Sequence, residues 1–411
     1  MPSALEGVRV VEITHWQQGP YASAMLADLG ADVIKVEAPK GPDPSRHFLF
    51  HRALAVSPYF ETHNRGKRSL VIDLKDSKGK DVFLQLVRRS DVVLHNLRGG
   101  AMERLGLAYE ALRQVNPAII YVHASAYGQE GPDTNLGSFD MLAQARGGIM
   151  SVNGEPDDPP LPVPVPIADQ VGAIVTAFGI LAALIYRERT GEGQYVNASL
   201  LGSQLALQSF NISMYYLTRR VPRRQPRGAF GPTWTTYRCG DGKYIALGML
   251  EDRWWPGVCQ ALERPELATD PRYTTAQDRG RNARELIAHM DGIFQQGPAR
   301  EWVRRFRELG LLVELVQDYE DIINDQQVAA NGYIQEIEWP GHDEPFRMVN
   351  SPIRFGRTPA RIRGMAPAFG QHTEEILLDL GLTREEVRGL EEEGVIVTAT
   401  GAALGQQEEP D

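Results

Sequence analysis

Residues 8–37, VRVVEITHWQQGPYASAMLADLGADVIKVE, decide the fold that we predict for this chain. Residues 8–13, VRVVEI, are mostly β-branched and predict a buried strand. Gly and Pro then open a helix over 19–29, with the proline well placed in the first helical turn. Residues 31–37 predict the next strand. A strand, a helix and a strand in such close succession form the unit of a parallel sheet covered by helices.

The same alternation continues up to residue 126. Further strands are predicted at 68–74, 91–96 and 118–126, with helices at 77–89 and 102–115 between them. The chain is therefore expected to contain a large α/β domain of the doubly wound, Rossmann-like kind, in which ligands bind beyond the carboxyl ends of the strands.

The length, charge and cysteine content of the chain narrow the functional classes to which it can belong. A chain of 411 residues exceeds the usual size of a single core, so two domains are expected. Acidic residues outnumber basic ones, 53 to 43, which disfavours a nucleic-acid binder. Cys239 and Cys259 have no zinc-site or disulfide-framework spacing, and no metal site is predicted. The N-terminal residues lack the pattern of a secretory signal, so a cytoplasmic location is expected.

A second, smaller domain is expected to begin near Ala229, with a hairpin at 237–249 followed by helical patterns. The segment 219–228, RRVPRRQPRG, precedes it and carries five arginines. It reads either as a solvated linker or as a counter-charge for phosphates or a partner subunit. The tail after Ala399 is small, polar and acidic, and predicts disorder.

Residues 159–187, PPLPVPVPIADQVGAIVTAFGILAALIYR, combine a proline-rich approach with an apolar helix. The prolines predict an extended, rigid segment, and the helix is expected to begin at Asp169, with that aspartate as its N-cap. The uncharged run 171–186 predicts a helix packed closely on several sides rather than a membrane span. The first-turn amides and the helix dipole would also keep a buried carboxylate ionised, as a nucleophilic aspartate requires. Both interpretations of Asp169 stay open from this stretch alone.

The loops at the carboxyl ends of the predicted strands are candidate ligand sites, at 14–20, 95–104 and 124–132. None contains GxGxxG, so a nicotinamide-dependent oxidoreductase is not supported. Each loop also has a simpler explanation, because Gly-Pro and Gly-Gly pairs commonly punctuate α/β connections.

Several segments in the same order resemble the class III CoA-transferases, the group that includes formyl-CoA and carnitine CoA-transferases. They are residues 5–46, 64–74 (NRGKRSLVIDL), 90–132, the proline-rich Asp169 stretch, 188–200 (ERTGEGQYVNASL), 241–247 (DGKYIAL), 270–282 (DPRYTTAQDRGRN) and 370–382 (GQHTEEILLDLGL). The resemblance covers nearly the whole chain.

This resemblance implies an acyl-CoA:carboxylate CoA-transferase, with an acyl-CoA donor, a carboxylic acid acceptor and no metal or redox cofactor. It also implies two chains interlocked like ring links, with no nucleic-acid or membrane partner. The expected division of each chain is 1–200 for the first part of the large CoA-binding domain, 201–228 for a linker, 229–325 for a small α+β domain, 326–398 for a return linker and the C-terminal part of the large domain, and 399–411 for a disordered tail.

The family's functional residues match individual positions of this chain. Asp169 corresponds to the nucleophile that forms an aspartyl anhydride and an aspartyl-CoA thioester, and Gln17 and His15 lie in the active-site loop. The positions that match contacts to coenzyme A are Gln18, Lys40, Ile72, Asp73, Leu74, Lys75, Asn96, Leu97, Arg98, Arg104, Phe139 and Asp140.

Some positions depart from the family pattern. Ala38 and Gly137 stand where some members have basic residues. Contacts to the CoA phosphates are therefore expected to involve Lys40, Arg46 or the arginine segment 219–228. Related acyl-CoA racemases carry Gly-His-Asp where this chain has Ser-Phe-Asp at 138–140, so the imidazole base for α-proton abstraction is missing.

The region 227–242 also lacks the glycine-rich loop of formyl-CoA transferases, which argues against oxalate and formyl-CoA as the substrate pair. Trp16 and Phe139 are candidates for lining a roomier acyl pocket, or for buried core. A racemase or isomerase, and a CoA-binding protein without activity, remain the alternatives.

Overall fold

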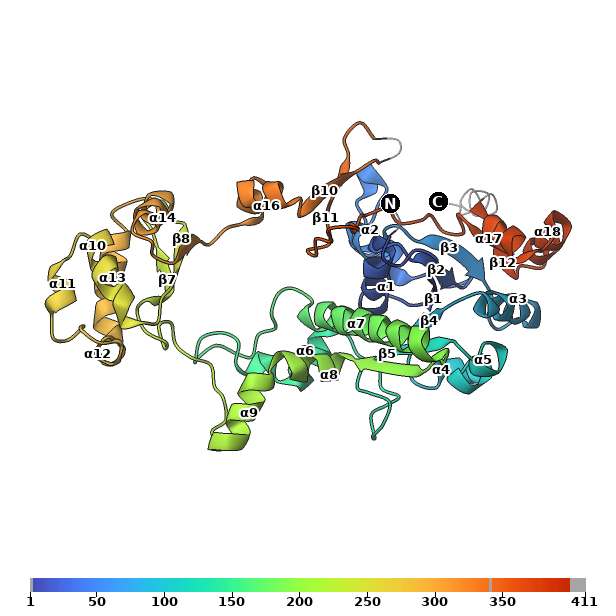
Figure 1. The fold of residues 1–411 in the computed structure, drawn as a ribbon, viewed down its shortest axis with the longest axis horizontal. Helices are drawn as coiled ribbons and strands as arrows, with labels where there is room; N and C mark the ends of the chain where they lie inside the picture. Colours follow the sequence, from blue (N-terminus) through green and yellow to red (C-terminus); the bar gives the residue numbers. More distant parts are fainter. Residues whose placement is uncertain (1–2, 340–341, 400–411) are drawn as a thin grey trace. The chain divides into compact units, whose positions relative to one another are not determined.

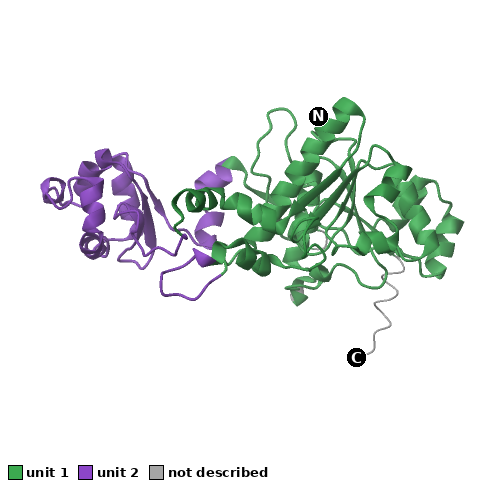
Figure 2. Ribbon diagram, turned by 90° about the horizontal axis from the view of Figure 1, so that it is seen from below, with its two compact units in different colours: residues 1–150, 162–220, 331–411 green, residues 151–161, 221–330 purple. Residues whose placement is uncertain are grey.

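The computed structural model describes residues 3–339 and 342–399. The chain forms two compact units, coloured separately in Figure 2: unit 1 comprises residues 1–150, 162–220 and 331–411, and unit 2 comprises residues 151–161 and 221–330. Part of the predicted linker at 201–228 is instead helical and belongs to unit 1, as α8 (Leu200–Leu207) and α9 (Ser209–Thr218). From residue 400 on, the predicted disordered tail lies outside the described residues.

Unit 1 is built on a seven-stranded sheet with the order β12-β3-β2-β1-β4-β5-β6. All strands are parallel except β12, which pairs antiparallel with β3. The strands are β1 (Arg9–Ile13), β2 (Asp32–Glu37), β3 (Arg68–Ile72), β4 (Val92–His95), β5 (Ile120–Ser125), β6 (Tyr195–Ser199) and β12 (Ile396–Val397). The prediction of an α/β fold is confirmed. Because the chain runs outward from β1 in both directions, the switch in strand order lies between β1 and β4.

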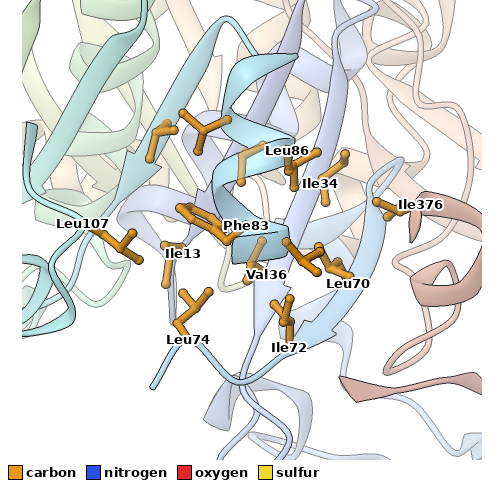
Figure 3. Packing of buried hydrophobic residues seen from close by; sticks show 14 of the residues in the cluster. Ile13, Ile34, Val36, Leu70, Ile72, Leu74, Phe83, Leu86, Leu107 and Ile376 are labelled. Carbon is orange, nitrogen blue, oxygen red and sulfur yellow. The ribbon is translucent and has the colours of Figure 1, made fainter. Parts of the chain in front are cut away.

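Helices cover both faces of this sheet (Figure 1). One face packs against α1 (Gln18–Asp28) and α7 (Ile167–Thr190). The other packs against α3 (Ser77–Arg88), α5 (Tyr109–Val115), α17 (Thr373–Leu380) and α18 (Arg384–Glu392). Figure 3 shows this second core, where Phe83 lies among side chains of the strands. Ile376 belongs to the same cluster, so the C-terminal segment completes a core begun near the N-terminus.

Helix α7 differs from its prediction in two ways. It begins at Ile167, two residues before Asp169, and only one of its faces is buried. Ala173 and Ile180 pack on the sheet, whereas Ile174 and Phe178 remain 54% and 72% exposed. The helix is long and apolar enough to span a membrane by composition alone, although 39% of its most apolar window is buried inside the protein. It therefore serves as a sheet-covering helix whose outer face carries exposed apolar side chains.

The remaining elements of unit 1 connect and border the sheet. The helix predicted over 102–115 is broken at Gly106, whose φ of 71° suits glycine, into α4 (Ala101–Leu105) and α5. The additional helices are α2 (Pro58–Asn64), α4 (Ala101–Leu105) and α6 (Asp140–Gly147), with 3-10 turns η1 (Pro44–Arg46), η2 (Arg52–Leu54) and η3 (Ile149–Ser151) and the hairpin β10 (Ile334–Ile337) and β11 (Phe346–Val349).

Unit 2 is an α+β unit with its own core. Its antiparallel sheet has the order β7-β8-β9, with β7 (Trp234–Arg238), β8 (Tyr244–Gly248) and β9 (Val313–Leu315). Its helical elements are η4 (Asp252–Trp254), α10 (Trp255–Ala261), α11 (Glu266–Thr269), α12 (Ala276–Arg281), α13 (Ala283–Phe294), α14 (Ala299–Glu308) and α15 (Tyr319–Ile323), and α16 (Gln326–Asn331) lies at the boundary with unit 1. Cys239 and Cys259 are buried free thiols of this core. Over residues 3–339 and 342–399 no cluster of His, Cys, Asp and Glu is arranged to hold a metal.

Candidate functional site

A cavity of about 430 Å³ opens in unit 1 beyond the carboxyl ends of β1, β4 and β5. This is the place at which the strand order reverses, where the sheet topology predicts a ligand. Nine of the residues proposed from the sequence line it: His15, Trp16, Gln17, Gln18, Asn96, Leu97, Arg98, Phe139 and Asp169.

The loop after β1 is fastened to the loop after β4. The amide N–H of His15 donates to Asn96 Oδ1 at 2.9 Å, and Asn96 Nδ2 donates to the His15 carbonyl at 2.7 Å. This reciprocal pair satisfies backbone groups that the strands leave unpaired at the switch point. Asn96 therefore has a structural role that fixes one wall of the cavity.

Trp16 follows in a left-handed backbone conformation, with φ of 65°. Such a conformation is unfavourable for a residue with a Cβ atom and persists only when its surroundings hold it. Here the Trp16 amide donates to Asp43 Oδ1 at 3.2 Å, and Asp43 is paired with the buried Lys35 ammonium at 2.9 Å. Burial alone would raise the pKa of Asp43, but Lys35 lowers that pKa to about 2, so Asp43 is a carboxylate.

Gln17 presents a free donor to the cavity. Its side chain is 1% exposed, and the Tyr59 hydroxyl donates to Gln17 Oε1 at 3.0 Å. Gln17 Nε2 has no hydrogen-bond partner in the described part of the chain. A buried amide without a partner is costly, and such groups are often kept for a ligand or for catalysis.

Asp169 lies in the first turn of α7, but it is not the N-cap that the sequence predicted. The capping role belongs to Asp140, whose Oδ1 accepts from the amides of Ala168 and Asp169 at 2.7 and 3.1 Å. Gln144 Nε2 donates to the other Asp140 oxygen at 2.6 Å. The side chain of Asp169 is thereby released from capping and lines the cavity.

The Asp169 carboxyl is also less acidic than expected. Burial, followed by the nearby Asp140 carboxylate, raises the pKa of Asp169 to about 7. The expectation that the helix terminus would keep this group fully ionised is therefore wrong, because Asp140 already neutralises the first-turn amides. At neutral pH the protonated and ionised forms are of comparable population.

Two histidines of the cavity are held neutral. Burial lowers the pKa of His15, with Asp43 opposing that shift, and burial lowers the pKa of His123. The His123 Nε2 lies 3.1 Å from the Leu97 carbonyl, and the sequence reasoning did not single out this residue.

The other proposed CoA residues lie outside the cavity lining. Lys40, Lys75 and Arg104 are exposed in the loops and the helix that follow β2, β3 and β4. Asp73 is partly exposed and accepts from the Lys75 amide, closing a turn. Ile72 and Leu74 are 0% and 8% exposed core residues, so their side chains are not available to a ligand and only the backbone of this segment is.

The structure bears on the expected phosphate contact at Arg46 and on the departure at Gly137. Arg46 is bound to Glu37 at 2.5 Å and to the Pro367 carbonyl, so it is not a free phosphate ligand. A Cβ atom at Gly137 would lie 2.7 Å from Arg98 Nε. The Arg98 guanidinium thus occupies the space that a side chain at position 137 would need.

Tyr59 is a second polar residue that the sequence analysis did not single out. It lies on α2, which Ser57 caps through the Phe60 amide and Pro58 opens. This Ser-Pro pair is a recognisable helix start that predicts α2. Nothing local to residue 59, however, indicates that its hydroxyl contacts Gln17, 42 positions away.

Comparisons with known proteins agree on the family. The family described as CoA-transferase family III matches residues 5–373. A succinyl-CoA:mesaconate CoA-transferase of Haloarcula hispanica is 35% identical, covering 92% of this chain and 97% of its own, and a formyl-CoA:oxalate CoA-transferase of Streptomyces coelicolor is 33% identical, covering 96% and 99%.

A solved structure supports the same relationship. A CAIB/BAIF family protein from Brucella suis superposes with a TM-score of 0.84 at 29% sequence identity, covering 92% of this chain and 100% of its own. The family match, the curated relatives and the α/β architecture lead to one conclusion: the chain belongs to CoA-transferase family III and is a transferase enzyme.

Proposed function

We propose that this protein is an acyl-CoA:carboxylate CoA-transferase in which Asp169 is the nucleophile. The observation that carries the proposal is the pairing, in one cavity, of a carboxyl group freed from helix capping with the unpartnered Gln17 Nε2 donor. A carboxylate supplies the nucleophile for acyl transfer, and a preorganised N–H donor stabilises the oxyanion that forms when a carbonyl is attacked.

The first half of the reaction follows from carboxylate chemistry. An ionised Asp169 oxygen attacks the donor thioester carbonyl, the C–S bond breaks, and CoA leaves as a thiolate from a mixed anhydride. The thiolate then attacks the aspartyl carbonyl, which releases the donor as a free carboxylate and leaves an aspartyl-CoA thioester. Each attack passes through an oxyanion, for which Gln17 Nε2 is the donor in the cavity.

The second half reverses the order. The acceptor carboxylate attacks the aspartyl thioester, expels CoA thiolate and forms a second anhydride. The thiolate attacks the acceptor carbonyl, giving the new acyl-CoA and restoring the Asp169 carboxylate. The sequence needs no net oxidation or reduction, and each bond broken is matched by one of similar kind.

Basic side chains at the carboxyl edge of the sheet support the binding of CoA phosphates. Lys40, Lys75, Arg98 and Arg104 all follow parallel strands, and the carboxyl ends of such strands meet at one edge. Arg98 takes the position expected of a basic residue at 137. We propose that these four cations, rather than Arg46, contact the phosphates.

A racemase of the same family is the alternative, and one residue argues against it. Phe139 lines the cavity where the related racemases have a histidine, and a phenyl ring abstracts no proton. Solvent deuterium incorporation at the α-carbon of an acyl-CoA, in the absence of an acceptor acid, is the result that favours this alternative.

We also propose an interlocked homodimer. Phe178 on α7 and Phe210 and Leu217 on α9 are 72%, 73% and 81% exposed, which is unusual for apolar side chains of a folded monomer. A second copy of the chain is the covering partner that the family resemblance implies. Light scattering on the purified protein should give the mass of two 45.7 kDa chains.

The test of the catalytic proposal compares the protein with Asp169→Asn, which keeps the shape of the side chain. Mass spectrometry should detect new thioesters when the natural protein is incubated with acyl-CoA donors and carboxylic acids, and none with the variant. Calorimetry should show that the variant still binds CoA. Undiminished transfer by Asp169→Asn contradicts the proposal.

A further inference from the structure

The cavity beside Asp169 has an aromatic wall, formed by Trp16, Phe48, Tyr59 and Phe139. Trp16 is its centre and contacts the other three rings edge to face, at centroid distances of 5.6 Å to Phe48, 6.5 Å to Tyr59 and 5.8 Å to Phe139. Phe48 and Tyr59 also contact each other at 5.1 Å. Trp16 and Phe139 line the cavity itself, whereas Phe48 and Tyr59 contact the indole without belonging to the cavity lining.

The left-handed backbone conformation of Trp16 is energetically unfavourable and is held by neighbouring residues. Its left-handed conformation is retained by Asp43, which accepts from the Trp16 amide, and by the Asn96 clamp on the preceding residue. Glycine would adopt this conformation without strain, yet the position carries the largest side chain. Backbone strain of this kind accumulates where a side chain is used for function.

Apolar side chains around the same cavity remain exposed. Leu136, Phe139 and Leu142 line it and are 54%, 58% and 50% exposed. An apolar group that covers these side chains contributes favourable binding free energy, because burial of apolar area is the main favourable term in such contacts. The lining therefore suits an acyl group with a bulky apolar end.

The charges of the lining do not favour a second carboxylate on the acyl group. Among the described residues that line the cavity, Arg98 is the one with a guanidinium or ammonium group, and it lies against Gly137. Burial lowers the pKa of His15 and of His123, which leaves both imidazoles uncharged at neutral pH. Asp169 already experiences the negative charge of Asp140, and another anion beside them meets the same repulsion.

We infer that the acid exchanged at Asp169 is an arylalkanoic monocarboxylic acid, whose ring packs on Trp16 and Phe139. The inference rests on the proposed CoA-transferase function and adds its substrate class. It differs from the oxalate and mesaconate named for the relatives, which are dicarboxylic acids. In this class, 3-phenylpropanoate has the same chain as succinate with a phenyl ring in place of the second carboxylate.

Identity exchange tests the inference without knowledge of the natural pair. The protein is incubated with 3-phenylpropanoyl-CoA and deuterated 3-phenylpropanoate, with succinyl-CoA and deuterated succinate, or with butanoyl-CoA and deuterated butanoate, and label entering the thioester is followed by mass spectrometry. The reaction moves CoA between two copies of one acid, so it is balanced without any other reactant. We expect kcat/KM for the phenyl acid to exceed that for butanoate at least tenfold, with succinate the slowest.

Two variants assign the preference to the aromatic wall. Phe139→Ala removes the exposed ring, and Trp16→Gly removes the indole while suiting the left-handed backbone. Either change should lower the ratio of kcat/KM for 3-phenylpropanoate over butanoate at least fivefold. Phe50→Ala is the matched control, because Phe50 is 42% exposed and lies outside the cavity lining, and it should leave the ratio unchanged.

The possible results distinguish failure of the inferred substrate class from failure of the proposed CoA-transferase function. Exchange that is lost in Asp169→Asn but fastest with succinate overturns the substrate class and leaves the CoA-transferase proposal standing. An unchanged ratio in both wall variants also overturns the inference. Absence of exchange with all three acids overturns the inferred substrate class, whereas the proposed function is overturned by undiminished transfer in Asp169→Asn.

Discussion

The Asp140 carboxylate holds the backbone of Asp169, because its Oδ1 accepts the Asp169 amide at 3.1 Å together with the Ala168 amide at 2.7 Å. One acidic residue thus caps the helix whose first turn carries another. The arrangement fixes the position of Asp169, frees its side chain, and places a negative charge close enough to raise its pKa to about 7.

Replacement of Asp140 should separate these effects. Asp140→Asn keeps an acceptor for the two amides but removes the charge, so the pKa of Asp169 should fall and the pH of half-maximal acylation should drop by roughly one unit. Asp140→Ala also loses the cap and should cost about 1 to 2 kcal/mol of unfolding free energy. Stopped-flow CoA release and urea denaturation measure the two quantities. Identical pH profiles for Asp140→Asn and the natural protein contradict the proposed electrostatic link.

Asp169 itself should make stability and activity depend on pH in opposite ways. An unfolded aspartate ionises near its usual pKa of 3.8, whereas the folded protein keeps the proton up to about 7. Folding therefore loses stability as pH rises between these values, and the loss is complete above about 7. Acylation should rise over the same range, because the attacking group is the carboxylate.

Asp169→Asn should remove this loss of stability at high pH, because asparagine does not ionise. Because the Asp169 residue is only partly buried, the gain in unfolding free energy at pH 8 should be on the order of 2 kcal/mol rather than the larger value of a fully buried group. Urea denaturation at pH 5 and pH 8 should show the larger gain at pH 8. A gain that is the same at both values excludes the raised pKa as its source.

Tyr59 should act by orienting Gln17. Its hydroxyl donates to Gln17 Oε1, which leaves Nε2 directed away from that bond and available to an oxyanion. Tyr59→Phe should therefore lower kcat about tenfold with little change in KM for acyl-CoA. In a Gln17→Ala background the same change should have almost no further effect on kcat. Additive losses in the double variant are the result that assigns Tyr59 a separate role.

The buried Lys67 and its three hydrogen-bond acceptors should contribute strongly to the free energy of unfolding. The Lys67 ammonium donates to Glu12, Asn64 and the Pro20 carbonyl within 2.9 Å, and its side chain is fully buried. Lys67→Met removes the buried ammonium that neutralises Glu12 and should cost about 3 to 5 kcal/mol in urea denaturation. The control is Lys78→Met, whose partner Glu393 is half exposed, with an expected cost below about 1 kcal/mol. Equal costs for the two variants contradict the assignment.

Local sequence patterns predict the sheet because the spacing of apolar residues along the chain differs between strands and covering helices. The strands β1 to β5 lie within the predicted ranges, and the cavity lies at the switch point that their order implies. The apolar run of α7 predicted a helix but not which of its faces is buried, since partner surfaces are not encoded locally.

The errors at the candidate site involve contacts between distant segments. The sequence around Asp169 predicts an N-cap at that residue, whereas the cap comes from Asp140 in an earlier helix. Ile72 and Leu74 match family positions, but α17 and β12, more than three hundred positions later, help to enclose them in the core. Tyr59 and Gln17 meet only after folding.

The central claim is that Asp169 becomes acylated, and hydroxylamine tests it most directly. The protein should be incubated with an acyl-CoA and hydroxylamine without an acceptor acid, digested, and sequenced by tandem mass spectrometry. The account predicts an aspartyl hydroxamate at Asp169, with stoichiometric loss of activity and none formed without the donor. Full turnover with an unmodified Asp169, or the hydroxamate on another carboxylate, would contradict it.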